Sequence, residues 1–85
     1  MRLPIIKHLS LFIEENDVDY VHEAAEILEA LTEAPGIKDE ELDVIGELIS
    51  NMYGAIEVQS MIDSGTDRKQ ALKEFMNRVL GSIDK

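Results

Sequence analysis

Hydrophobic residues recur every three or four positions along most of the chain, a spacing that predicts α-helices rather than strands. A first helix is predicted over about Pro4–Glu15 and a second over about Val18–Glu33, each with apolar residues along one face. Pro4 suits the first turn of a helix, where its missing N–H costs little, and Asp17 is a favoured cap for the second helix. Ala34-Pro35-Gly36 then ends the second helix, because proline and glycine oppose its continuation.

The third predicted helix is about twice the usual length and carries two apolar stripes. It starts near Asp39, a plausible cap, and continues to about Ser64. One stripe comprises Leu42, Ile45, Ile49, Met52 and Ile56, and the other comprises Val44, Leu48, Ala55, Val58 and Ile62. A helix that is apolar on two sides is expected at the centre of a bundle or in contact with a partner.

A fourth helix is predicted over about Asp67–Leu80, after a short joint in which Gly65 ends the third helix and Thr66 caps the fourth. Gly81 is expected to end this helix, with fraying from Ser82 to Lys85. A chain of 85 residues supports one hydrophobic core. The sequence therefore predicts a single domain, residues 1–85, with an all-α fold: a compact four-helix bundle-like domain with a long third helix.

Small residues on the third helix suggest an interface. Gly46, Ser50 and Gly54 are spaced four apart, and each glycine costs about 1 kcal/mol in a helix interior relative to alanine. Close approach of a neighbouring backbone would offset that cost, and a kink at Gly54 is the alternative. Tyr53 and Met61 flank the small residues. The predicted interface is therefore Gly46, Ser50, Tyr53, Gly54 and Met61.

Acidic residues dominate the charge and concentrate in the middle of the chain. Eighteen acidic residues against eight basic ones give a net charge of −10, and Lys38 is the one basic residue between Glu14 and Asp63. Such a field repels nucleic-acid phosphates and anionic membranes, so neither direct nucleic-acid binding nor membrane binding is expected. A protein partner with a basic patch fits better, although the charge could serve only to keep a small domain in solution. No apolar stretch reaches the length of a membrane span, and a cytoplasmic protein is expected.

Candidate catalytic or metal-binding residues are sparse. The chain has no cysteine, and its two histidines, His8 and His22, fall on different predicted helices. Asp19, His22 and Glu26 share one face of the second helix and could hold a divalent cation, but bundle metal sites draw ligands from several helices. A solvated face is favoured, and cation binding there stays open. We therefore predict a protein that is not an enzyme, with no catalytic, cofactor-binding or metal residues.

Much of the chain is similar to a family of short, acidic, uncharacterised proteins, a domain of unknown function from Bacteroidetes-type bacteria. The similar stretches are residues 3–9 (LPIIKHL), 12–17 (FIEEND), 39–58 (DEELDVIGELISNMYGAIEV) and 75–83 (FMNRVLGSI). The resemblance implies no activity or ligand. It does imply genomic neighbours that encode peroxiredoxin- and thioredoxin-like proteins, which a cysteine-free acidic protein could assist only by binding them.

The leading functional hypothesis is a non-catalytic protein-interaction module that binds a protein partner or self-associates as a dimer, and that serves redox proteins as an accessory. The alternatives are an acidic nucleic-acid mimic that binds a basic protein, and a small accessory subunit that binds a metal or ligand.

Overall fold

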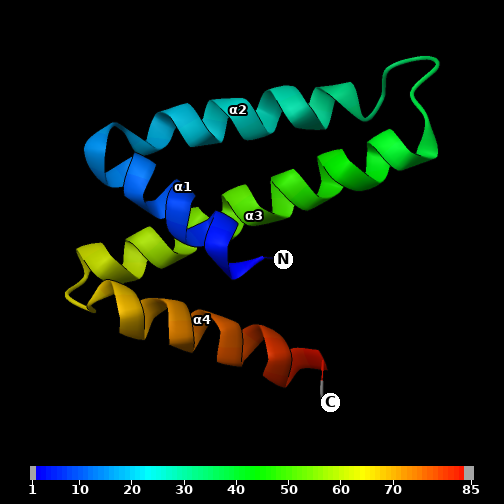
Figure 1. Cartoon of the computed structure of the whole chain (residues 1–85). Coiled ribbons are helices and arrows are strands. Elements are labelled where there is room, and N and C mark those ends of the chain that lie inside the picture. The colour runs from blue at the N-terminus through cyan, green and yellow to red at the C-terminus, as the bar shows by residue number, and fades with distance from the viewer. Residues whose placement is uncertain (1, 84–85) are drawn as a thin grey trace.

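The computed structural model describes the backbone of residues 2–83 and the side chains of residues 2–79. Its helices are α1 (Leu3–Glu15), α2 (Val18–Leu31), α3 (Asp39–Asp63) and α4 (Arg68–Ile83), as Figure 1 shows. Within residues 2–83 there is no strand. The predicted all-α fold, a four-helix bundle-like domain with a long third helix, is confirmed.

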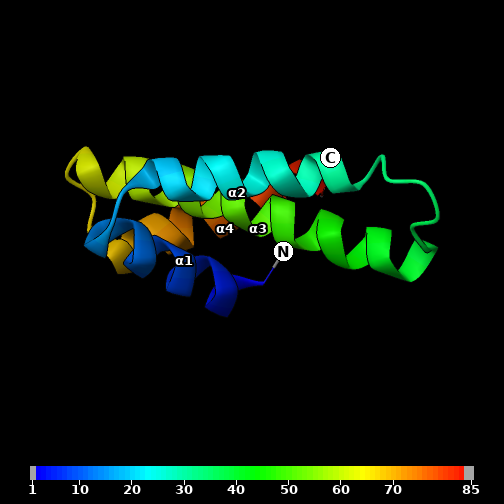
Figure 2. The same ribbon diagram turned by 90° about the horizontal axis from the view of Figure 1, so that it is seen from above.

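Helix α3 is the centre of the molecule, because α1, α2 and α4 all contact it. Helices α2 and α4 lie on opposite sides of α3 and do not contact each other within the part of the chain described (Figure 1). Helix α1 lies across one broad side of this layer, as the view from above shows (Figure 2). The molecule is consequently flat, with extents of 44 × 35 × 17 Å.

The helix ends follow local chemistry. The Asp17 side chain accepts a 3.0 Å hydrogen bond from the Asp19 N–H and caps α2, as predicted. Gly65 follows α3 with φ of 113°, a conformation that glycine adopts readily. The N–H groups of Gly65 and Thr66 bond back to the carbonyls of Ile62 and Met61, which is the Schellman arrangement.

Several predicted boundaries need correction. Helix α2 ends at Leu31 rather than Glu33, because Thr32 turns the chain and its hydroxyl bonds to the Glu29 carbonyl. Lys38, not Asp39, precedes α3, and the Glu41 side chain accepts from the Lys38 N–H at 2.9 Å.

Helix α4 begins one residue later than predicted. The Asp67 carboxylate, not Thr66, accepts a hydrogen bond from an N–H of the first turn, that of Gln70, at 2.8 Å. The helix continues through Gly81 to Ile83, so that glycine does not end it. Residues 84 and 85, part of the segment expected to fray, lie outside the described residues.

The hydrophobic core lies where α1, α3 and α4 meet and where α2 begins. Its buried members are Ile6, Ile13, Val21, Ala55, Val58, Ala71, Leu72 and Phe75. Within α3, buried residues occur only from Asn51 to Gln59. The first half of α3 therefore pairs with α2 but contributes no fully buried residue.

Candidate functional site

The predicted interface residues divide into three groups. Ser50, Tyr53 and Gly54 together line a shallow groove of about 610 Å³ between α3 and Phe75 of α4. Gly46 is exposed on α3, and a Cβ placed there would meet open space. Met61 is half-buried and packs against the core. The structure thus brings three of the five residues together.

Gly54 is the small residue that another element approaches closely. A Cβ at this position would lie 3.0 Å from Phe75 Cζ and 3.3 Å from Ile6 Cδ1. The neighbours are therefore side chains of α4 and α1 of the same chain, not the backbone of another helix. Gly54 is buried beneath them, so its absent side chain is a requirement of the core.

Tyr53 joins α3 to α2 through its hydroxyl, which donates a hydrogen bond to the Glu29 carboxylate. This hydrogen bond, followed by partial burial and by the charges of Glu29 and Glu26, raises the pKa of Tyr53 above its ordinary value of 10.0. Tyr53 is 44% exposed and borders the α3–α4 groove. Tyr53 therefore combines a structural hydrogen bond with an accessible aromatic surface.

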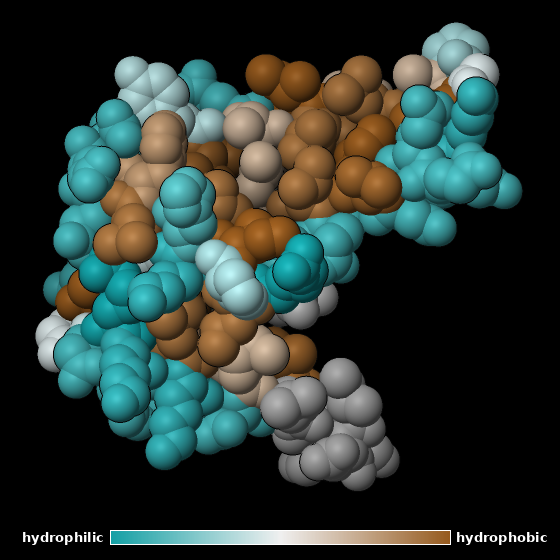
Figure 3. Space-filling model, in the orientation of Figure 1, coloured by the Kyte–Doolittle hydropathy of each residue, from teal (hydrophilic) through white to brown (hydrophobic). Residues whose placement is uncertain are grey.

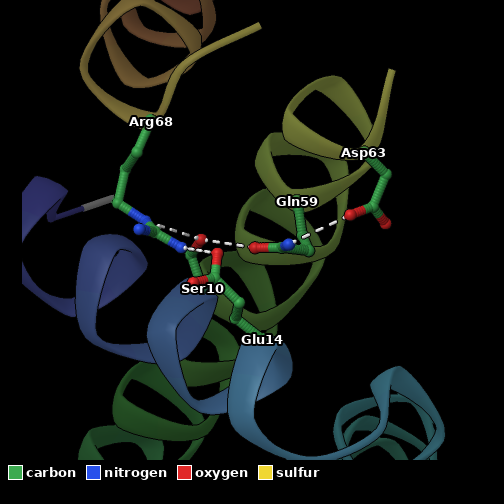
Figure 4. Close-up of polar contacts among 5 residues, drawn as sticks. All are labelled: Ser10, Glu14, Gln59, Asp63 and Arg68. Carbon is green, nitrogen blue, oxygen red and sulfur yellow. Dashed lines mark hydrogen bonds and ion pairs between the residues drawn. The ribbon is translucent and has the colours of Figure 1, made fainter. Parts of the chain in front are cut away.

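A polar cluster links α1, α3 and α4, reaching from buried Ser10 and Gln59 to the surface, and Figure 4 shows its members pointing toward one another. The Ser10 hydroxyl donates to Gln59 Oε1 at 2.8 Å, and Gln59 Nε2 donates to Asp63 at 3.2 Å. Arg68 pairs with Glu14 and reaches Ser10 Oγ at 3.4 Å. Because Ser10 and Gln59 are buried, these bonds satisfy groups that would otherwise destabilise the fold.

Sequence reasoning missed this cluster, together with buried Asn51, which accepts the Arg2 N–H at 2.9 Å. A signal was available, since Ser10 follows Ile6 by four residues and precedes Ile13 by three, which puts it on the buried face of α1. Every buried side-chain N or O atom in the described part of the chain has a hydrogen-bond partner. The cluster therefore stabilises the contact of α1 with α3 and α4.

An apolar surface lies on the hairpin of α2 and α3, on the half that α1 does not cover. It comprises Ile27 and Leu31 of α2 and Val44 and Leu48 of α3, and we call it the hairpin face. Ile27 and Val44 are 63% and 59% exposed. Figure 3 shows hydrophobic surface gathered over these two helix segments.

Val44 and Leu48 of the hairpin face lie on the same side of α3 as residues that are buried farther along the helix. At 100° per residue, Val44 and Leu48 fall in the same sector of about 80° as Asn51, Ala55 and Val58. Those three residues are buried, whereas Val44 and Leu48 are exposed. This part of the stripe therefore presents exposed apolar side chains that another helix could cover. No helix among the described residues covers them.

A second groove, of about 930 Å³, lies between α1 and α4. Its walls combine apolar and basic side chains: Leu3, Pro4, Leu72 and Met76 with Lys7, Arg68, Lys69 and Lys73, beside Asn77. Among the residues whose side chains are described, no acidic one lines it, in a chain with eighteen acidic residues. We call it the basic groove; it is a local reversal of the net charge.

Asp19, His22 and Glu26 are exposed on α2. Among residues whose positions are described, no three His, Asp or Glu side chains are grouped closely enough to hold a metal ion. Over the same residues, no helix combines the length and apolar character needed to cross a membrane.

The comparisons with known proteins identify a family of unknown function. A model described as a family of unknown function, DUF6952, matches residues 1–84, and the chain belongs to this family. Neither the curated proteins nor the solved structures include a match to the chain. The expected membership of an uncharacterised family is confirmed.

Proposed function

We propose that this member of the DUF6952 family is a non-catalytic protein-interaction module that binds a protein partner through the hairpin face. The observation that carries the proposal is the uncovered half of the α3 stripe, where Val44 and Leu48 are exposed although their counterparts Ala55 and Val58 are fully buried. Contiguous apolar surface of this kind is characteristic of docking sites. The internal bonding of Ser10, Gln59 and Asn51 supports a non-catalytic role.

The charge around the hairpin face defines the chemistry of the partner. Helix α2 carries four acidic residues and α3 carries seven, and neither contains lysine or arginine. Glu23 and Glu40 each precede an exposed apolar residue of the face, Ile27 and Val44, by one helical turn. A complementary partner presents apolar side chains flanked by lysine or arginine.

Two substitutions on one helix test the proposal. We expect a partner recovered from the native host to bind the purified Val44→Gln/Leu48→Gln variant at least about tenfold more weakly than wild type in calorimetry, because the apolar contacts are lost. Glutamine keeps helix propensity, so the fold is retained.

Ser60→Gln is the matched control, since Ser60 is an exposed residue of the groove between α3 and α4. Unchanged binding by Ser60→Gln is expected. Loss of binding in this variant, with Val44→Gln/Leu48→Gln unaffected, would move the site to the predicted surface around Ser50, Tyr53 and Gly54. Recovery of peroxiredoxin- or thioredoxin-like proteins would support the redox accessory role that the resemblance implies.

A second candidate function is mimicry of nucleic acid, favoured by the eleven acidic residues on two adjacent helices without a basic residue. A basic partner held in this way would bind mainly through charge, so its affinity would fall steeply as salt rises. The affinity of a partner bound mainly through apolar side chains would change far less with salt concentration. Calorimetry at two salt concentrations separates the two functions.

A further inference from the structure

The basic groove and the hairpin face are chemically complementary. The groove has an apolar floor that includes Leu3, Leu72 and Met76, and it is bordered by Lys7, Lys69 and Lys73. These three lysines are exposed and form no ion pair with a described residue, whereas Arg68, also in the groove, pairs with Glu14. The groove therefore offers apolar contact together with three available positive charges.

The shape of the groove suits a helix better than a small molecule. Sites for small ligands enclose most of the ligand surface, whereas this groove lies open along two helices. Lys69 and Lys73 are one turn apart on α4, and this spacing matches carboxylates one turn apart on a docked helix. An amphipathic acidic helix placed with its apolar side in the groove is the occupant this chemistry recognises.

The chain itself carries such a helix surface. Val44 and Leu48 on α3 stand beside Glu40 and Glu41, and neither α2 nor α3 contains lysine or arginine. Pairing two hairpin faces with each other would bring acidic helices together, and like charges in contact are costly. Pairing a hairpin face with a basic groove joins opposite charges and apolar surfaces at the same time.

Both surfaces are accessible from one broad side of the flat molecule. Figure 3 shows the hydrophobic surface over α2 and α3 and, in the same view, a second hydrophobic area over α1 and α4. Two copies that meet through this side can each place a hairpin face against the basic groove of the other. Such reciprocal contact about a twofold axis gives a closed dimer.

We infer that the partner of the hairpin face is the basic groove of a second copy of this chain, so that the protein forms a reciprocal, charge-complementary dimer. The inference rests on the proposed function, because it names the partner of the same face. It also assigns a role to the basic groove, whose positive charge is otherwise unexplained in an acidic protein.

Charge reversal tests the dimer. Light scattering over a concentration series is expected to give a dimer for wild type and at least about tenfold weaker dimerisation for Lys69→Glu/Lys73→Glu. Glu23→Lys/Glu40→Lys, which reverses charges beside the hairpin face, should weaken dimerisation by a similar factor. Combining all four substitutions in one chain should restore dimerisation, because each surface then again faces its opposite charge. Circular dichroism at each step verifies that these exposed substitutions leave the helices intact.

Three results would overturn the inference. The first is a wild-type monomer up to millimolar concentration, and the second is a dimer indifferent to Lys69→Glu/Lys73→Glu. The third is that the variant with all four substitutions does not regain dimerisation although both double variants are folded. The proposed function stands apart from these results: a monomer that loses a different protein partner on Val44→Gln/Leu48→Gln retains its function but not this dimer.

Discussion

At the scale of single residues, the same amino acid has different roles at different places on α3. Gly54 lies beneath Phe75 and Ile6, whereas Gly46 faces open space eight residues earlier on the same helix. Polar residues divide similarly, since buried Asn51 and Gln59 are held by hydrogen bonds while Ser50 and Ser60 border a groove. Neighbouring elements, rather than residue type, decide each role.

Substituting the two glycines by alanine separates helix propensity from packing. Gly46→Ala is expected to stabilise the fold by about 1 kcal/mol, because alanine is the better helix former and its Cβ meets nothing. Gly54→Ala gains the same propensity but forces Phe75 to move, and overpacking costs about 1–3 kcal/mol. Chemical denaturation should therefore rank Gly46→Ala above Gly54→Ala by at least about 1 kcal/mol. Equal stabilisation at both sites would contradict the close packing of Gly54.

The Tyr53–Glu29 hydrogen bond predicts a dependence of stability on alkaline pH. It raises the pKa of Tyr53 in the folded state, so the folded chain keeps a proton that the unfolded chain loses near pH 10.0. The contribution of Tyr53 is present below that pH and disappears as the pH rises through the folded pKa. Denaturation of Tyr53→Phe at a series of pH values should show a shallower loss of stability above pH 10.0 than wild type. Tyr20→Phe, which keeps this hydrogen bond, should retain the wild-type slope.

At the scale of elements, the two stripes of α3 show which features of the fold could be predicted from the sequence and which could not. Spacing alone predicted a long helix that is apolar on two sides and central, since periodicity reports which side of a helix avoids water. It could not tell that α1 covers the stripe from Asn51 onward and leaves Val44 and Leu48 exposed, because the crossing point of two helices depends on their packing. The basic groove could not be predicted from the sequence for the same reason. Lys7 and Lys73 are distant in sequence and line one groove only because α1 contacts α4.

Two valines on this stripe allow a matched test of its two halves. Val58 is fully buried, and Val58→Ala removes two methyl groups from the core, which should cost about 2 kcal/mol of unfolding free energy. Val44 is 59% exposed, and Val44→Ala should change stability by less than about 0.5 kcal/mol at concentrations where the protein is monomeric. Denaturant titration of both variants measures the difference. Similar losses at the two sites would mean that the hairpin face is covered within the chain.

At the scale of the whole molecule, flatness and uneven charge go together. A domain 17 Å thick cannot surround every helix with others, so apolar side chains remain on its broad sides. The acidic residues gather on α2 and α3, and most basic residues lie on α1 and α4. The molecule therefore has an acidic surface on α2 and α3 and a basic groove between α1 and α4, and the proposed dimer pairs these two surfaces.

Local stability should differ between the part of the hairpin without buried residues and the buried part of α3. The half of the hairpin from Ile27 to Leu48 has no buried residue, so its amides are expected to exchange by local opening at a lower free energy than those of Asn51–Gln59. Hydrogen exchange measured by NMR at low protein concentration would reveal two levels of protection within the single helix α3. Uniform protection along α3 would contradict a separately opening hairpin.

The connection between α2 and α3 lies at the tip of the hairpin, away from α1 and α4 (Figure 1). Its residues Pro35 and Gly36 are exposed, and Gly36 adopts a φ of 83° that releases the chain from helical geometry. Exposed tips of this kind accept inserted sequence with little penalty. A peptide epitope or a dye-labelled cysteine placed after Gly36 would give the protein a handle for immobilisation or energy transfer while leaving both recognition surfaces intact.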